Sequence, residues 1–380
     1  MDEAGKKANK KKQRSGVLIC GAYGMRNAGD EAVLDAILAS LQRIDPALPV
    51  TVLSRDPAET AARHHCGAIP EFGLFGLWRA LRRTKLFISG GGSLIQDATS
   101  SRSLWFYLYT IAAAHRRGCR VMMYGCGVGP VSRRPDRRAA GRVIDRCVDA
   151  ITVREATSLD ELRSLGVTRP EITLAAEPAL TLGPAPEERL DAIFAAHGME
   201  QGGHYFCLCI RRWPGIRQKS GIFAAAAEYA REKYGMTPVL LSVNIKQDSE
   251  SAHRVREKIT GDCVLVTEDM TVPEIIGFLS RMDMVMAMRL HALIFSASRS
   301  VPLIGISYDP KVAAFLDYIS QTNYIDFDEL TDVSQLLPMI DAAAGADRDA
   351  LRAATERLVA LEGRNLETAQ RLLNEQEERA

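Results

Sequence analysis

The sequence predicts an α/β protein made of two Rossmann-like domains that face each other across a cleft. Short apolar, β-rich runs alternate with helical patterns along the whole chain of 380 residues. Such alternation is typical of parallel sheets that are covered by helices on both faces. Gly-Pro-Ala-Pro and Gln-Gly-Gly interrupt the pattern once, indicating a linker over 183–203. We therefore expect domains over 16–182 and 204–340, with C-terminal helices over 341–380 that pack back across the first domain.

Eleven apolar runs of strand length carry this prediction. Each is rich in Val, Ile, Leu, Tyr or Phe, and each is followed by glycine, a polar loop or a helical pattern. In the first domain the runs lie at 17–20, 50–54, 86–89, 121–125, 150–153 and 172–175. In the second domain they lie at 205–210, 239–243, 264–267, 284–288 and 302–307.

Composition is that of a globular protein from the cytoplasm. The chain is 47% hydrophobic and 25% charged, with a formal net charge of +1. We find no apolar run close to the roughly 18 residues of a membrane span and no secretory segment. Residues 1–15 hold six basic residues against Asp2 and Glu3. This basic leader could draw the protein to the inner face of an anionic membrane, although a disordered solubilising leader is favoured.

Three loops that contain glycine follow strands of the first domain. They read GAYGMRNAGDE from 21, GGGSLIQD from 90 and GCGVGP from 125, and the second is expected to open a helix. Ligands bind such sheets beyond the carboxyl ends of the strands, and glycine lets the backbone approach them closely. For Asp30, capping of the following helix is an equal alternative. The candidate binding residues are Gly24, Asn27, Asp30, Glu31, Gly91, Gly92, Ser93, Gln96, Asp97 and Gly127.

Cationic residues follow three strands of the second domain. They are Arg211 and Arg212 after 205–210, Arg289 and His291 after 284–288, and Lys311 after 302–307. Cations at a helix N-terminus oppose the helix dipole, so their presence there indicates an anion held between them. A structural ion pair is the alternative for any one arginine. For the whole set, a phosphorylated or carboxylated small molecule is favoured.

Other polar and aromatic clusters carry weaker predictions. Arginines at 134, 138, 142 and 146 form a stripe, and 72–85 mixes aromatic residues with bases. Either could meet a membrane or a lipid diphosphate, but a solvated face and an ordinary amphipathic helix are favoured. His64-His65-Cys66 indicates a surface loop, because the cysteines and histidines lack the spacing of a metal site. We expect no metal and no cofactor.

Taken together, these motifs resemble the polysaccharide pyruvyl transferase family, in particular its bacterial cell-wall, CsaB-type branch. The matching segments are GAYGMRNAGDEAVLDAI from 21, SGGGSLIQD from 89, GCGVGPV from 125, ITVRE from 151 and MRLHALIFSASRSVPLIGISYDPKV from 288. The family's Arg-Leu-His falls on 289–291, and its arginine after the first strand of the second domain falls on Arg211 or Arg212. Glu177 stands where the family commonly has Asp, and 244–248 matches poorly.

The resemblance implies a GT-B-like fold and transfer of an enolpyruvyl-derived group from phosphoenolpyruvate to a saccharide, forming a cyclic ketal. For this branch, the implied acceptor is lipid-linked, contains N-acetylmannosamine and serves to anchor surface-layer proteins. As a hypothesis, Arg211 or Arg212, Arg289 and Lys311 hold the donor, and His291 is the general acid. Asp30 or Glu31 would deprotonate or orient the acceptor hydroxyl.

Two other functions compete with this one. A GT-B glycosyltransferase would bind a nucleotide sugar in a similar cleft, and a non-catalytic saccharide-binding protein could share the fold. Binding to nucleic acid is not expected, because the chain beyond its leader is slightly acidic and shows no such motif.

Overall fold

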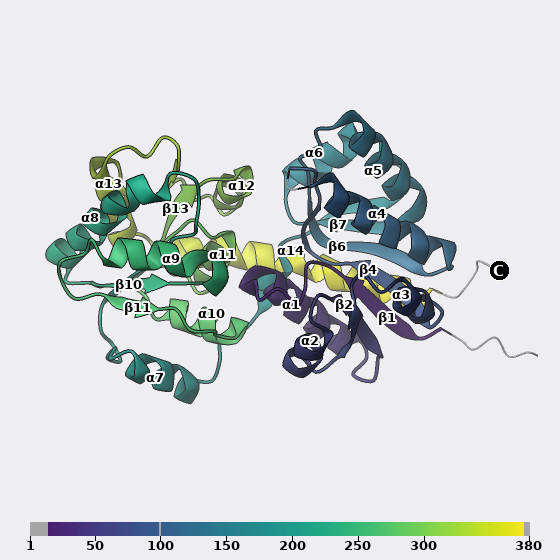
Figure 1. The fold of residues 1–380 in the computed structure, drawn as a ribbon, viewed down its shortest axis with the longest axis horizontal. Coiled ribbons are helices and arrows are strands. Elements are labelled where there is room, and N and C mark those ends of the chain that lie inside the picture. The colour runs from purple at the N-terminus through teal and green to yellow at the C-terminus, as the bar shows by residue number, and fades with distance from the viewer. Residues whose placement is uncertain (1–13, 99, 376–380) are drawn as a thin grey trace, which may run out of the picture.

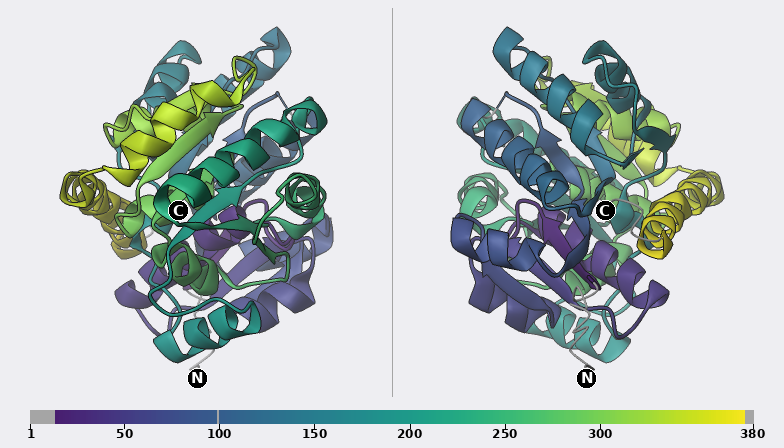
Figure 2. Two further views of the ribbon diagram at one scale, coloured as in Figure 1. Left: turned by 90° about the vertical axis from the view of Figure 1, so that its left-hand side faces the viewer. Right: turned by 90° about the vertical axis from the view of Figure 1, so that its right-hand side faces the viewer.

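Two parallel sheets, one in each half of the chain, form the protein (Figure 1). The structure is a computed structural model that describes residues 14–98 and 100–375; the basic leader lies almost wholly outside them. Helices cover both faces of each sheet (Figure 2). The predicted fold class is confirmed. The domain limits themselves stay a prediction.

The first sheet contains β1 (Gly16–Cys20), β2 (Val50–Ser54), β3 (Gly67–Pro70), β4 (Thr84–Ser89), β5 (Gly92–Ile95), β6 (Arg120–Val128), β7 (Ala150–Val153) and β8 (Glu171–Leu174). Its order is β3-β2-β1-β4-β6-β7-β8, with β5 paired to β6. All six predicted strands are present. The central ones are buried, as their apolar sequences require.

The second sheet contains β9 (Tyr205–Cys209), β10 (Thr237–Leu241), β11 (Val264–Val266), β12 (Met284–Ala287), β13 (Leu303–Ser307) and β14 (Tyr324–Asp326). Its order is β11-β10-β9-β12-β13-β14. The five predicted strands are confirmed here too. The three strands that carry the cationic loops, β9, β12 and β13, are neighbours in this order.

Three strands were not predicted, namely β3, β5 and β14. Each has only three or four residues and carries Gly, Pro or Asp, so none forms an apolar run. One expectation is corrected as a result: the glycines at 90–92 lead into β5 and not into a helix. The third glycine segment also differs, because Gly125 and Gly127 lie inside β6, where its pairing with β7 shifts register.

The helices of the first half are α1 (Ala28–Ile44), α2 (Pro57–His64), α3 (Leu74–Leu81), α4 (Ser101–Arg116), α5 (Arg134–Cys147) and α6 (Ala156–Ser164), followed by the 3-10 turn η1 (Pro178–Thr181). Those that follow are α7 (Glu187–Ala196), α8 (Ile216–Tyr234), α9 (Ile245–Arg256), α10 (Val272–Ser280), α11 (Leu290–Ser298), α12 (Pro310–Tyr318), the 3-10 turn η2 (Val333–Gln335), α13 (Leu337–Ala344) and α14 (Arg348–Asn374).

Two helices connect the halves. The predicted linker segment holds α7, which packs on the second half through an ion pair between Arg189 and Glu274. The long C-terminal helix α14, yellow in Figure 1, runs behind both sheets. Its Asn365 donates a hydrogen bond to the carbonyl of Ala176 in the first half, and Thr355 donates one to Ala297 in the second. The predicted return of the C-terminus across the first domain is thus confirmed.

None of the helices among the described residues is long and apolar enough to cross a bilayer.

Candidate functional site

The cationic residues of the second domain lie at the carboxyl ends of three adjacent strands. Arg211 follows β9, Arg289 and His291 follow β12, and Lys311 follows β13. Positive charges on Arg289 and Lys311 both lower the pKa of His291, so the three side chains lie within electrostatic range of one another. Parallel strands in this order therefore bring Arg289, His291 and Lys311 together and place Arg211 after the neighbouring strand.

His291 lies in the first turn of α11 and faces the first turn of α1 in the other domain. A Cβ added to Gly29 would lie 2.2 Å from Nδ1 of His291, so only glycine allows this approach. Burial lowers the pKa of His291 to about 3, helped by Arg154, Lys311 and Arg289. Its Nε2 is buried and accepts or donates no hydrogen bond among the described residues. The imidazole is therefore neutral and holds an unused nitrogen in the cleft.

Arg289 is held by two residues of α9. Its Nε lies 3.1 and 3.0 Å from the two carboxylate oxygens of Asp248, and its Nη2 donates to Gln247 at 3.0 Å. Asp248 is 1% exposed and also accepts the backbone N–H of Asn244. An ion pair, the alternative for any single arginine, is thus present here. Among the described residues, no hydrogen bond or ion pair engages Nη1 of Arg289, which leaves that donor for a ligand.

Arg211 and Arg212 lie in different environments. The guanidinium of Arg211 stacks over the ring of Tyr308 at 4.4 Å, and its Nε is buried with no hydrogen-bond partner in the described chain. Arg212 is exposed. Of the two, only Arg211 presents an unsatisfied donor, which is costly to bury unless a ligand supplies the acceptor.

Lys311 opens α12 and is about one third exposed. Its Nζ lies 3.4 Å from Asp309, which also caps that helix. The lysine charge acts on groups of both domains, since it lowers the pKa of His291 and that of Asp30. Lys311 therefore lies where the two domains meet.

Asp30 lies in the first turn of α1 and faces this cluster. Burial raises the pKa of its carboxyl to about 6, although Asn27 donates a hydrogen bond to it. A Cβ on Gly92 would lie 3.4 Å from Oδ1, so the second glycine loop borders the same carboxylate. Asp30, Asn27 and Gly92 are thus brought together. The cap of α1 is not made by Asp30, because Asn27 holds the N-cap position.

A buried arginine that was not predicted from the sequence extends this side of the site. Arg154, after β7, pairs with Glu177 and with Glu155 at 2.7 Å, and it donates to the hydroxyl of Ser93 at 3.1 Å. Its charge also lowers the pKa of His291. Glu155 belongs to the matched segment ITVRE, and Glu177 stands where the family commonly has Asp. Both residues were noted in the sequence, but neither was assigned to the site.

A narrow pocket separates the two sides of this cluster. It is lined by Arg154, Glu155, Glu177 and Leu180 from the first half, by Leu290, Ile294, Lys311, Phe315 and Tyr318 from the second, and by Leu358 of α14. Its volume is about 20 Å³, which is room for one or two waters.

Other candidates from the first domain have structural contacts. Glu31 accepts the backbone N–H of Gly24 at 3.0 Å and contacts His64 at 2.9 Å, and Asp97 accepts the N–H groups of Ser132 and Arg133 before α5. Gly91 packs tightly on Val33 of α1, and Gly127 on Arg154, Glu155 and Ser93. Gln96 is half-buried just beyond β5. Glu31 and Asp97 are therefore engaged within their own domain.

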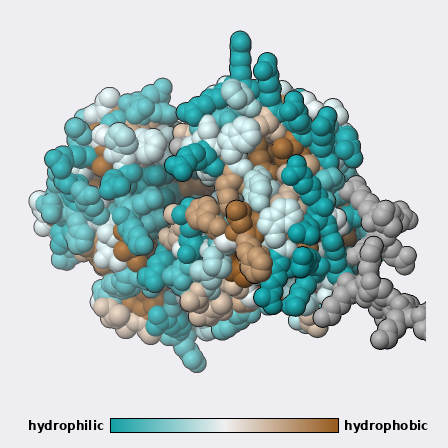
Figure 3. Space-filling view, turned by 45° about the vertical axis from the view of Figure 1, so that its right-hand side comes forward, coloured by the Kyte–Doolittle hydropathy of each residue, from teal (hydrophilic) through white to brown (hydrophobic). Residues whose placement is uncertain are grey.

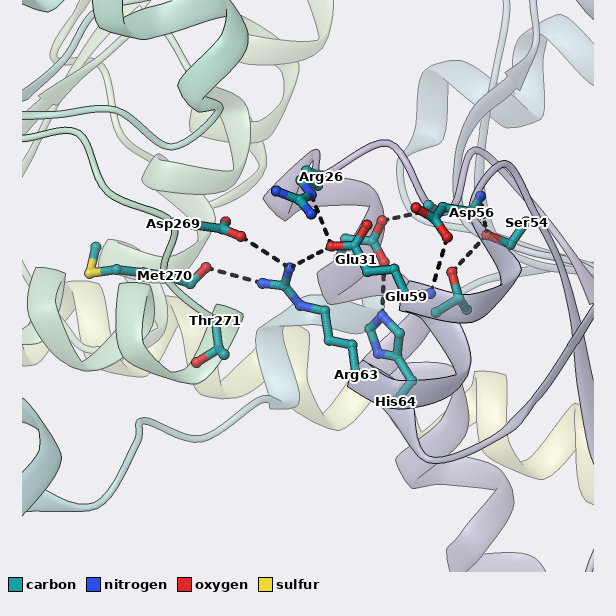
Figure 4. A network of polar contacts seen from close by, with 12 residues as sticks. Arg26, Glu31, Ser54, Asp56, Glu59, Arg63, His64, Asp269, Met270 and Thr271 are labelled. Atoms are coloured by element: carbon teal, nitrogen blue, oxygen red, sulfur yellow. Dashed lines mark hydrogen bonds and ion pairs between the residues drawn. The ribbon is translucent and has the colours of Figure 1, made fainter.

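His64 corrects another expectation, since it is buried at the end of α2 and not in a surface loop (Figure 4). It contacts Asp35 at 2.6 Å and Glu31 at 2.9 Å. Burial alone would lower the pKa of His64, but these two hydrogen-bonded carboxylates raise it to about 9. Next to it, Arg63 reaches the carbonyl of Met270 at 3.2 Å, joining α2 to the second domain (Figure 4).

The fold defines a GT-B-like protein with two Rossmann-like sheets, and cationic side chains of the second half lie near the carboxylate of Asp30 in the first. The structure is similar to UDP-GlcNAc 2-epimerase from Methanocaldococcus jannaschii, with a TM-score of 0.64 and 11% identity over 92% of this chain and 99% of that one. It is also similar to S. aureus MnaA in its structure with UDP (TM-score 0.66, 10% identity, 93% and 94% covered) and to Anabaena HepE with UDP and glucose (0.62, 11%, 94% and 100%). These likenesses show the fold alone.

The sequence, unlike the fold, shows the family of the chain. Residues 27–310 match the polysaccharide pyruvyl transferase family, and the chain belongs to that family. No curated protein matches it beyond chance.

Proposed function

We propose that the protein transfers an enolpyruvyl-derived group from phosphoenolpyruvate to a saccharide, forming a cyclic pyruvate ketal and releasing phosphate. The observation that carries the proposal is the convergence of Arg211, Arg289, His291 and Lys311 on one side of the cleft with Asp30 on the other. Family membership supports the pyruvyl transferase class.

The donor suits the cationic side. Phosphoenolpyruvate carries a phosphate and a carboxylate, and arginine binds both kinds of group in a forked geometry. Arg211 offers its buried Nε, Arg289 its Nη1, and Lys311 a further positive charge. Asp248 fixes the guanidinium of Arg289 before the donor arrives, which lowers the entropic cost of binding.

His291 supplies the proton for the first chemical step. C3 of the enol must gain a proton, and the positive character that develops at C2 is then attacked by one saccharide hydroxyl. The C2–O bond to phosphate breaks and phosphate leaves; a second hydroxyl then attacks C2 to close the ring, and its proton passes to the released phosphate. The neutral His291 of the free protein gains its proton when a bound dianion offsets Arg154, Lys311 and Arg289.

Asp30 is the base for the attacking hydroxyl. Its pKa of about 6 makes it mostly ionised at neutral pH while keeping it basic enough to accept a proton. Glu31, the other candidate, has both carboxylate oxygens engaged within the first domain. The acceptor hydroxyl is therefore expected to approach Asp30, beside the second glycine loop that borders this carboxylate.

Loading of two substrates between the halves of the chain is expected to involve opening, followed by closure for transfer, as in other enzymes whose site lies between domains. As the acceptor we propose the lipid-linked, N-acetylmannosamine-containing saccharide of the CsaB-type branch, on the strength of the matched segments.

Calorimetric titration with phosphoenolpyruvate and with UDP tests the donor. We expect phosphoenolpyruvate to bind, with Arg211→Gln and Arg289→Gln each weakening it about tenfold or more. Arg212→Gln is the matched control, because this neighbouring arginine is exposed, and it should bind like the wild type. Binding of UDP without phosphoenolpyruvate would instead support a nucleotide-sugar glycosyltransferase.

A further inference from the structure

Large apolar side chains are exposed together on one face of the first domain, over α3 and α4 (Figure 3). Phe75 is 83% exposed, Leu74 59% and Phe72 58%, and Trp105 on α4 is 50% exposed. A contiguous apolar patch in water marks a contact surface. We define the aromatic face as Phe72, Leu74, Phe75, Trp78, Trp105 and Tyr109.

Contacts between these side chains hold the aromatic face together. The ring of Phe72 lies 5.2 Å from that of Phe106 on α4, and the indole N–H of Trp78 donates to the hydroxyl of Tyr109 at 3.1 Å. Residues 105 and 109 are one helical turn apart and therefore share a side of α4. The face is thus a single surface shared by the two helices.

The two segments that carry the aromatic face are positively charged. Segments 72–83 and 100–117 contain six arginines and no aspartate or glutamate. Five of these arginines, at 79, 82, 83, 102 and 116, are exposed, and Arg117 stacks on Trp78 at 4.3 Å. Aromatic rings prefer the headgroup region of a bilayer, and exposed arginines are attracted to anionic headgroups. This combination favours an anionic lipid surface over a protein partner.

The position of the aromatic face supports the same partner. Arg14 contacts Cys119 just beyond α4, and the sequence before Arg14 contains five lysines. On the inner side, Phe106 contacts the ring of Tyr107 at 5.3 Å, and the charge of Asp30 acts on the pKa of Tyr107. Helix α4, which carries part of the aromatic face, therefore also carries a residue within electrostatic range of Asp30.

We propose that the aromatic face docks on an anionic lipid bilayer, with Leu74 and Phe75 inserted among the headgroups and the arginines of α3 and α4 on their phosphates. Docking in this orientation turns the Asp30 side of the cleft toward lipid-borne molecules. A lipid-linked acceptor would be reached from there, and only this last point rests on the proposed function.

Vesicle flotation of the full chain tests the docking. We expect binding to phosphatidylcholine vesicles that contain phosphatidylglycerol, little binding to phosphatidylcholine alone, and weakening by salt. Phe75→Ser should weaken binding about tenfold, and Arg79→Gln with Arg82→Gln about tenfold or more. Val359→Ser and Arg352→Gln with Arg357→Gln, which alter exposed residues of α14, are the controls and should bind like the wild type.

Two results would overturn the docking proposal. One is vesicle binding that is absent, or that Phe75→Ser and the arginine variant leave unchanged. The other is a concentration-dependent dimer in light scattering that Phe75→Ser dissociates, which would assign the aromatic face to a second copy of the chain. Circular dichroism checks that each variant is folded. Phosphate release with a water-soluble acceptor should persist in Phe75→Ser, which separates this proposal from the chemistry.

Discussion

At the scale of single residues, two titratable groups in the first turns of α1 and α11 have pKa values moved in opposite senses. Burial and three cations lower the pKa of His291 to about 3, whereas burial raises that of Asp30 to about 6. Pairs of titratable groups whose environments push their pKa values apart commonly act as the acid and the base of an active site. Both assignments can be tested one residue at a time.

Binding of phosphoenolpyruvate should protonate His291. Its pKa lies far below neutral in the free protein, and a bound dianion raises it, so up to one proton is taken up near pH 7. Calorimetric titrations in buffers of different ionisation enthalpy measure this uptake. His291→Gln should abolish it and reduce kcat by about 10²–10⁴. His253→Gln, an exposed histidine of α9, should change neither quantity. Uptake that persists in His291→Gln would assign the proton elsewhere.

Asp30 should set the acid limb of the pH–rate profile. Activity of the wild type is expected to fall below about pH 6, as the carboxylate becomes protonated. Asp30→Asn should lower kcat about 10²–10⁴-fold and remove that limb. Glu31→Gln should instead lower stability, because Glu31 binds Gly24 and His64. The reverse pattern in the two variants would make Glu31 the base.

The buried His64 predicts how stability depends on pH. Because its pKa in the folded protein, about 9, lies above the unfolded value of about 6.5, its stabilisation is full below pH 6.5. It is lost as pH rises through 9, and the loss amounts to about 3 kcal/mol. Urea unfolding from pH 6.5 to 9.5 should show this fall in the wild type but not in His64→Gln. Parallel curves for the two proteins would contradict it.

At the scale of elements, the N-termini of α1 and α11 touch at Gly29 and His291. Gly29→Ala places a Cβ 2.2 Å from the imidazole, so we expect at least a tenfold loss of kcat/KM with the fold retained. Gly363→Ala in α14 meets nothing within 4 Å and should raise the free energy of unfolding by about 0.5–1 kcal/mol at unchanged activity. Equal activity in both variants would mean that the contact does not position His291.

The strands and their contacts also show how much of the structure can be predicted from the sequence. All eleven predicted strands are present, because a buried parallel strand needs an apolar run. Short strands such as β3 and β14 lack one, so they escaped prediction. The cations after β9, β12 and β13 were predicted together, since strand ends carry ligands in such sheets. The pairing of Arg289 with Asp248 was not predicted, because the partner follows a different strand, β10, and no local pattern records it.

At the scale of the whole molecule, two domains with facing carboxyl edges are joined by α7, by α14 and by contacts such as Arg63 with Met270. The narrow pocket between them is lined by Arg154 from the first half and by Lys311 from the second, and the charge of Lys311 lowers the pKa of Asp30. Neither domain alone holds both halves of the proposed chemistry. The proposed donor and acceptor sites therefore adjoin at the boundary between the two halves.

The measurement that tests this account most directly is phosphate release from phosphoenolpyruvate, with and without a lipid-linked N-acetylmannosaminyl disaccharide, followed by mass analysis of the saccharide. We predict release that depends on the acceptor and a product heavier by one ketal-linked pyruvate. Acceptor-dependent release should disappear in His291→Gln. Binding of phosphoenolpyruvate without release would redirect the search to other acceptors. If phosphoenolpyruvate does not bind and no phosphate is released, the central claim that the cleft is a phosphoenolpyruvate-dependent transferase site is contradicted.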